Sequence, residues 1–166
     1  MLVTIELPEP SLPLHCLAAR MIALLQRVRS AAVSVDGDVI GAIDRGVLVF
    51  IGVQRGDGDA QAERLAGRIL SYRVFADDQG RMNRSVVDIE GGVLLVPQFT
   101  LAADTRRGTR ASFSGAAEPV EGRRLFDRMV YEVRSRHATV ATGTFGADMQ
   151  VALVNDGPVT FWLQVA

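Results

Sequence analysis

Side chains able to carry out covalent or acid–base chemistry are scarce in this 166-residue sequence. It contains two histidines, His15 and His137, one cysteine, Cys16, and no lysine, so all 18 cationic residues are arginines. Without lysine there is no Schiff-base nucleophile and no Walker-type phosphate loop. A hydrolase that uses its own nucleophile normally places a base beside it, usually histidine. His137 follows a predicted helix, where a histidine favours the helix dipole, so a Ser-His-Asp triad is not indicated.

Acidic residues and cysteine do not form a recognisable metal site either. Asp57, Asp59 and Glu63 lie close together, but the glycine and the final glutamate of a calcium-binding loop are not at the required positions. One cysteine leaves no cluster of the kind that zinc needs. We therefore expect no metal and no other cofactor.

Two short stretches carry polar groups that the packing of apolar side chains does not explain. The first is Pro97-Gln98-Phe99-Thr100-Leu101, which follows an apolar strand, and the second is residues 155–161, Asn-Asp-Gly-Pro-Val-Thr-Phe, between two predicted strands. Ligand sites are commonly built where strands end. Taken alone, a Gly-Pro pair in a hairpin is expected to be trans, because only about 5% of X-Pro bonds in folded proteins are cis.

The rest of the sequence predicts a mixed α/β domain that positions these stretches. Turn residues at 36–38 and 45–46 are typical of antiparallel hairpins. Apolar residues at helical spacing predict one helix from a capping Asp59 to about Tyr72 and a second that opens at Pro119. The predicted strands are residues 21–28, 31–35, 39–43, 47–53, 93–99, 149–154 and 159–165.

Composition indicates a single cytoplasmic domain over residues 21–166. Residues 1–20 contain Pro8, Pro10 and Pro13 and are predicted to be an extension, either disordered or produced by a start assigned upstream of Met21. A single cysteine favours a reducing compartment, and no apolar run is long enough to span a bilayer. The formal charge of −1 argues against coating nucleic acid by charge alone, so any RNA contact must be local. Arginines concentrate in one loop, at positions 106, 107 and 110.

The two stretches together resemble the paired signature of the D-aminoacyl-tRNA deacylase family, Ser-Gln-Phe-Thr before Leu and Asn-x-Gly-Pro-Val-Thr near the C-terminus. The resemblance covers Met21 to the end, in order and at the family's spacing. Further matching segments are Met21–Val28, Ala32–Gly37, Gln98–Asp104 and Phe145–Val151.

The resemblance implies a three-layer β/β/α domain, mostly antiparallel with two main helices, that pairs as a homodimer with the active site at the subunit interface. By resemblance, the cis Gly157-Pro158 pair reaches into the partner's pocket and holds the α-amino group of the substrate. Two fixed carbonyls leave room for a side chain on one side of the α-carbon only, so an L substituent would clash. Glycine has no substituent to reject, and glycyl-tRNA(Ala) is therefore an expected second substrate.

The implied chemistry needs no side-chain nucleophile, which agrees with the shortage of bases. An aminoacyl ester is already activated, and the neighbouring 2′-hydroxyl of the terminal adenosine can assist the attack of water. The backbone around Gln98, Phe99 and Thr100 is expected to stabilise the oxyanion. Two alternatives stay open: an esterase with Thr100 as its nucleophile, and an inactive module that binds the tRNA 3′ end through the loop arginines.

Three further positions carry over from the family. Arg27 matches an arginine that supports the Gly-Pro loop, although it could equally be a surface cation. Phe145 and Met149 match residues that line the pocket for the terminal adenosine, although such a pair is also common in ordinary cores.

One position departs from the family pattern. Pro97 stands where the family usually has serine, which removes a hydroxyl and a backbone N–H. A related group of deacylases with a trans Gly-Pro and relaxed chirality also has proline there, whereas Phe99 and Val159-Thr160-Phe161 resemble the D-specific group.

Overall fold

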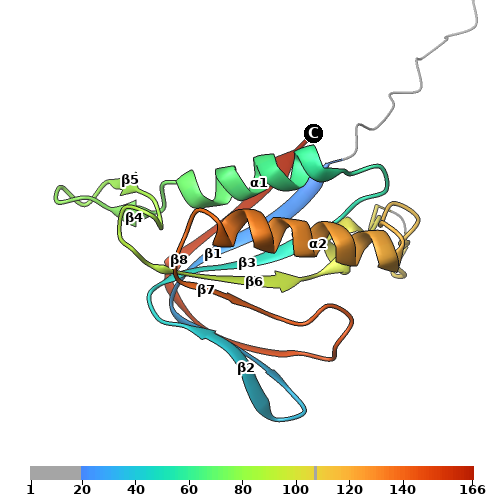
Figure 1. Ribbon diagram of the computed structural model, residues 1–166, viewed down its shortest axis with the longest axis horizontal. Helices are drawn as coiled ribbons and strands as arrows, with labels where there is room; N and C mark the ends of the chain where they lie inside the picture. Colours follow the sequence, from blue (N-terminus) through green and yellow to red (C-terminus); the bar gives the residue numbers. More distant parts are fainter. Residues whose placement is uncertain (1–19, 107) are drawn as a thin grey trace, which may run out of the picture.

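The computed structural model describes residues 20–106 and 108–166. The extension predicted for residues 1–20 lies outside this part of the chain except for Arg20, whose backbone N–H donates to Gln54 Oε1 at 3.2 Å. Two helices cover one face of a curved sheet, and the far half of the same sheet curls round to form a further layer (Figure 1). The three-layer β/β/α arrangement expected from the sequence is therefore confirmed.

Strand β1 (Met21–Val35) organises the sheet because it is long enough to hold two neighbours in succession along one edge. Its first half pairs with β3 (Gly46–Gly52), and its second half pairs with β2 (Asp38–Ile43). The β1–β2 hairpin at residues 36–38 agrees with the sequence. The hairpin predicted at residues 45–46 is wrong, because β2 and β3 run in the same direction and pair one after the other with the two halves of β1.

The centre of the sheet is parallel, which the sequence did not predict. Strand β6 (Gly92–Pro97) pairs in parallel with β3 on one side and with β7 (Val140–Thr142) on the other. The remaining pairings among the described residues are antiparallel, including the small β4–β5 hairpin (Phe75–Ala76 and Met82–Arg84). The parallel centre matters for function because it carries the end of β6 and the end of β3 to the same edge.

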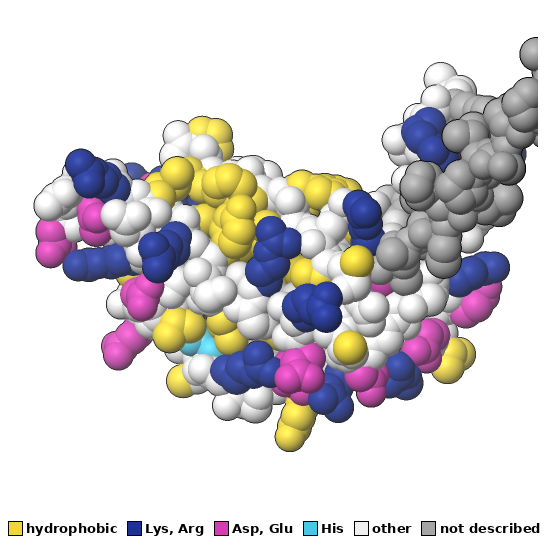
Figure 2. All heavy atoms as spheres, turned by 90° about the horizontal axis from the view of Figure 1, so that it is seen from above, with side chains coloured by type: hydrophobic (Ala, Val, Ile, Leu, Met, Phe, Trp, Pro, Cys, Tyr) yellow, Lys and Arg dark blue, Asp and Glu magenta, His cyan; other side chains and the backbone are white. Residues whose placement is uncertain are grey.

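The helices begin and end close to the predicted residues. Helix α1 (Asp59–Ser71) is capped by Gly58, whose N–H donates to Gln61 Oε1 at 3.1 Å, so the predicted cap at Asp59 is one residue late. Helix α2 (Pro119–Arg134) opens at its proline as predicted. Their outer side carries charges of both signs, whereas hydrophobic side chains gather on the side of the molecule away from α2 (Figure 2).

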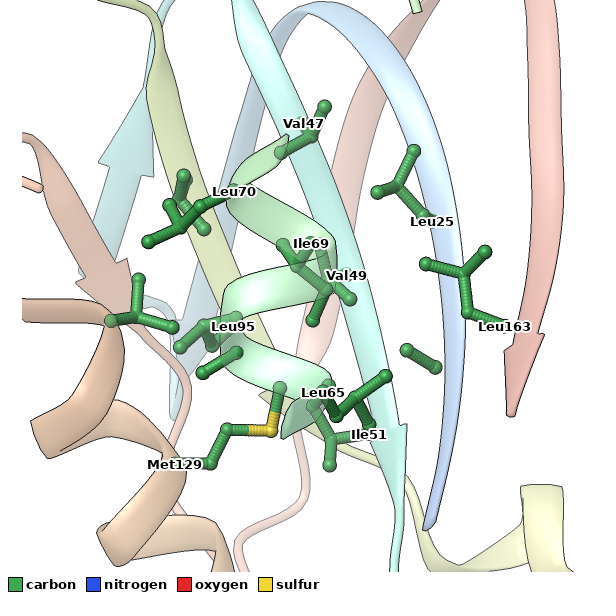
Figure 3. Close-up of a cluster of buried hydrophobic side chains, with 14 of the residues drawn as sticks. Leu25, Val47, Val49, Ile51, Leu65, Ile69, Leu70, Leu95, Met129 and Leu163 are labelled. Carbon is green, nitrogen blue, oxygen red and sulfur yellow. The ribbon is translucent and has the colours of Figure 1, made fainter. Parts of the chain in front are cut away.

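Alternation along β3 and β6 divides the interior into two cores. One set of side chains faces the helices, where it packs against the apolar stripes of α1 and α2 (Figure 3). The other set faces the curled half of the sheet. The first set includes Val47, Val49, Ile51, Val93 and Leu95, and the second includes Leu48, Leu94 and Val96. Successive side chains of a strand point to opposite faces, which is why both strands read as continuous apolar runs.

Strand β8 (Gln150–Val165) corrects the prediction of two strands separated by a turn. It pairs with β1 along nearly its whole length, and its register shifts where the Gly157-Pro158 pair stands. The pair is therefore an interruption inside one strand and not a hairpin. None of the described helices is long and apolar enough to cross a membrane.

Candidate active site at the end of strand β6

The chain changes from strand to a short 3-10 helix immediately after Pro97. Gln98 still donates its backbone N–H to the carbonyl oxygen of Ile51 at 2.7 Å, and helix η1 (Phe99–Ala102) then begins with Leu101 N–H bonded to Gln98 oxygen at 3.2 Å. The amides of Phe99 and Thr100 precede the first helical bond. Neither amide N–H finds an acceptor among the described residues, so both can donate to a ligand.

The Thr100 hydroxyl is held by a neighbouring amide, and no base is hydrogen-bonded to it among residues 20–106 and 108–166. Gln98 Nε2 lies 2.5 Å from Thr100 Oγ1, and both side chains lie at the protein surface. His137, the one histidine in the described ranges, lies elsewhere and contacts the carbonyl oxygen of Gly91 at 2.6 Å through Nε2. This arrangement supplies hydrogen-bond donors to a ligand, but it does not activate a threonine nucleophile.

An apolar pocket with a volume of about 270 Å³ opens beside these amides. Phe145 is in the wall of this pocket, and Gly122 of α2 makes room for it, since a Cβ there would lie 3.3 Å from Phe145 Cζ. The walls come from β3, the end of β6, α2 and the segment after β7. The lining residues are Ile51, Val53, Pro97, Phe99, Ala117, Pro119, Gly122, Phe126, Phe145 and Gly146.

Pro97 contributes its ring to this pocket and disturbs the sheet little. Gln98 donates its N–H toward β3, and successive residues of a strand direct their N–H groups to opposite sides, so an N–H at Pro97 would point toward β7. The pairing of β7 with β6 has already ended there, at Thr142. A proline is tolerated there because no ladder bond is lost.

Met149 is not among the pocket-lining residues. It packs against the second core, and its sulfur accepts the backbone N–H of Thr144 at 3.4 Å. Met149 also leaves no room for a side chain at Gly143, since a Cβ there would lie 2.7 Å from the Met149 sulfur. Met149 thus supports the segment that carries Phe145 and does not form the wall itself.

A buried carboxylate, that of Asp57, holds the backbone that follows β3 next to the pocket. Asp57 Oδ2 accepts the backbone N–H of Gln54 at 2.7 Å, and Gln54 forms an isolated bridge with Ala116. Burial raises the pKa of Asp57 to about 6, against the opposing effect of its backbone hydrogen bonds. This carboxylate therefore titrates in mildly acidic solution.

The Gly157-Pro158 peptide bond is cis, and Arg27 fixes the backbone next to it. Arg27 Nε donates to the Asp156 carbonyl oxygen at 2.8 Å, and Nη1 donates to the Val74 oxygen at 2.5 Å. The Arg27 side chain is only 15% exposed. Gly157 has φ +130°, and a Cβ there would lie 2.9 Å from Arg27 Nη2. Only glycine fits this conformation in contact with the arginine.

Within one chain, the Gly157-Pro158 pair and the Gln98–Thr100 segment lie far apart. Gly157 stands beside Arg27, which pairs with Val47, whereas Pro97 pairs with Ile51. Four residues along β3 correspond to about 13 Å, and the three strand spacings from β8 to β6 add about 14 Å in the perpendicular direction. One chain therefore does not bring the two predicted stretches together.

Comparison with known proteins identifies the family. The model of the D-Tyr-tRNA(Tyr) deacylase family matches residues 24–164. The chain belongs to this family. It is 67% identical to the D-aminoacyl-tRNA deacylase of Thioalkalivibrio sulfidiphilus over 145 residues, which cover 87% of this chain and 97% of that protein.

Solved structures support the same fold for this deacylase family member. The structure of the c-Myc DNA unwinding element binding protein is 34% identical with a TM-score of 0.84, and the match covers 87% of this chain and 99% of that one. A probable eukaryotic D-amino acid tRNA deacylase has a TM-score of 0.78 at 20% identity, covering 88% of this chain and 100% of that one, and it supports the fold alone.

Sequence reasoning missed most of the pocket of this deacylase family member. Phe126 and Gly122 lie on α2, where an apolar stripe predicts only core packing, and Ile51 belongs to the buried strand β3, which Val53 follows. Nothing in their pattern distinguishes a pocket wall from an ordinary core. Phe113 lies outside this lining, but its ring packs near that of Phe99, and it carried a usable signal because it is a large apolar residue in an otherwise polar and basic loop.

Proposed function

We propose that this protein hydrolyses the ester between a D-amino acid and the 3′ end of a tRNA, releasing free tRNA and the D-amino acid. The observation that carries the proposal is the pair of amides at Phe99 and Thr100, which have no acceptor within residues 20–106 and 108–166 and lie beside an apolar pocket. Family membership and the 67% identical deacylase supply the reaction class. The partner is therefore an aminoacylated tRNA, and removing D-amino acids from it is a proofreading step in translation.

Water attacks the ester carbonyl, and the two amides stabilise the resulting oxyanion. A preorganised backbone donor of this kind contributes about 3–4 kcal/mol to the transition state. The substrate's own 2′-hydroxyl lies next to the ester and assists the attack, so the protein has to orient the ester and does not need to supply a nucleophile. This explains how the chain works with a single histidine in its described part.

The apolar pocket receives the terminal adenosine. Its volume of about 270 Å³ and its aromatic walls suit a base, and Phe145 offers a ring for stacking. Pro97 replaces the serine hydroxyl common in the family with an apolar ring in this wall. We infer that this exchange alters binding of the adenosine and leaves the amide donors in place.

Chirality is read by a second copy of the chain. The Gly157 and Pro158 carbonyls of one subunit enter the pocket of its partner and hold the α-amino group, which leaves no space for an L side chain. The separation of the two stretches within one subunit supports this homodimer, as does Trp162, which is 50% exposed on the same strand. A filter that works by exclusion also admits glycine, so glycyl-tRNA(Ala) is a second substrate of this cytoplasmic enzyme.

Ester loss from D-tyrosyl-tRNA and from L-tyrosyl-tRNA, followed in parallel, tests the proposal. We expect release from the D-substrate well above the buffer rate and release from the L-substrate at the buffer rate. Binding of the tRNA end without D-specific turnover would identify an inactive binding module instead. Light scattering on the same sample tests the dimer, since a monomer with full D-specific activity contradicts a filter supplied by a partner.

A further inference from the structure

Two aromatic rings are exposed at the mouth of the pocket. Phe99 is 57% exposed and Phe113 is 45% exposed, and their ring centroids lie 5.2 Å apart with planes inclined by 52°. Phe99 also lines the pocket, whereas Phe113 does not. The apolar wall therefore continues from the pocket onto the surface, ending at the ring of Phe113. The adenosine pocket does not account for this outer ring.

Phe113 is held in place by the backbone around it. Asp104 and Ser112 exchange two hydrogen bonds, of 2.7 and 3.0 Å, that close the loop before it. The carbonyl oxygen of Phe113 accepts the N–H of Ala116 at 3.0 Å, and Arg55 N–H bonds to Gly115 oxygen at 2.9 Å. These hydrogen bonds tie the backbone on both sides of Phe113 to the chain near the end of β3.

The charge of the loop favours a polyanion over an apolar protein partner. Arg106 and Arg110 are both exposed on the hairpin that ends at Phe113. Arg106 pairs with Asp104 at 2.6 Å, whereas Arg110 has no acidic partner in the part of the chain that the structure describes. Exposed aromatic rings flanked by arginines are the usual platform for single-stranded nucleic acid, where bases stack on rings and cations meet phosphates.

We propose that Phe113 stacks on the base of the nucleotide that precedes the terminal adenosine, with Arg110 beside the intervening phosphate. The inference rests on the proposed function, because that nucleotide reaches Phe113 only when the adenosine occupies the pocket. It adds a binding residue for the unpaired end of the tRNA. Stacking does not depend on base identity, so Phe113 contributes affinity for every tRNA.

Short substrates separate this contact from the chemistry. We would compare hydrolysis of D-tyrosyl esters of adenosine and of the dinucleotide cytidylyl-adenosine. The native protein should show a higher kcat/KM for the dinucleotide. Phe113→Leu, which keeps apolar bulk but removes the aromatic face, should lower kcat/KM for the dinucleotide about 5- to 100-fold and leave the adenosine ester within about twofold. Phe113→Trp should restore the dinucleotide advantage.

Tyr131→Leu is the matched control, because Tyr131 is 65% exposed beside Arg128 on α2 and lies outside the pocket. It should change neither substrate. Equal losses of kcat/KM on both esters with Phe113→Leu would show that the ring only supports Phe99. No loss on either ester would show that the ring does not contact the substrate. A native protein that cleaves the adenosine ester but gains nothing from the added nucleotide overturns the stacking contact alone, whereas failure on every D-ester overturns the proposed function.

Discussion

Replacing Arg27 with methionine should destabilise the fold strongly, although the arginine sits near the surface. Its guanidinium donates to two main-chain carbonyls, of Asp156 and Val74, and lies 3.4 Å from the Asp156 carboxylate. Hydrogen bonds from a charged donor contribute about 1.5–3 kcal/mol each, so the loss of two costs about 3 kcal/mol after relief of the buried charge. Methionine keeps the apolar stem, which limits the change to the polar contacts.

Arg29→Met provides the matched comparison. Arg29 faces the same Asp156 carboxylate at 3.6 Å, but its side chain is 75% exposed, so its loss should cost about 0.5 kcal/mol or less. Urea unfolding of the two variants measures both values. D-tyrosyl-tRNA hydrolysis under folding conditions should fall for Arg27→Met alone. The reasoning fails if the two variants unfold within 1 kcal/mol of each other, or if Arg27→Met is folded and fully active.

Three further outcomes are expected. Gly122→Leu fills the pocket beside Phe145 and should raise KM for D-aminoacyl-tRNA at least about tenfold. Crowding of Phe145 should cost about 1–3 kcal/mol in urea unfolding, partly offset by the better helix propensity of leucine, almost 1 kcal/mol. Thr100→Ala should retain deacylation within about tenfold in single-turnover assays, since the amide and not the hydroxyl is used, and a complete loss would establish a nucleophilic threonine. Burial raises the pKa of Asp57 to about 6, so the folded state binds the proton more tightly than the unfolded state. The free energy of unfolding should therefore fall as pH rises from about 4 to 6. Asp57→Asn should flatten that decline when urea unfolding is measured at a series of pH values.

The sequence predicted the elements whose physics is local. Both helices and their buried stripes follow from apolar spacing and the proline at residue 119, and the β1–β2 hairpin follows from the turn chemistry at 36–38. Strand partners were harder, because a two-residue break such as Arg45-Gly46 is compatible with a hairpin and with two strands that continue in the same direction. Only the length of β1, which leaves room for β2 and β3 one after the other, decides between them. The polar residues near Arg29 interrupt the apolar pattern, so the sequence predicted two strands where the structure has the single strand β1.

Two parts of the candidate site could be picked out from the sequence because they break a strand pattern. Gln98 to Thr100 and the Gly157-Pro158 pair stand out because polar groups and unusual backbone occur where a strand should continue. The pocket between the end of β6 and α2 left no such trace, since Phe126 and Ile51 would have the same pattern in a filled core. Met149, expected to line the adenosine pocket, packs in this structure against the second core and accepts the N–H of Thr144.

Chemistry done by main-chain groups requires places where the sheet fails to pair. A regular ladder uses every N–H and carbonyl, so a chain without suitable side chains can offer donors and acceptors only where the ladder is broken. At the end of β6 the turn into η1 leaves two amides without acceptors among the described residues. In β8 the shifted register leaves residues 156–159 without partners on β1. One break supplies donors and the other supplies carbonyls, which are the complementary groups needed for an ester oxygen and an amine. Because the strand register keeps the two breaks apart within one chain, the joint use that we propose for them requires a second copy.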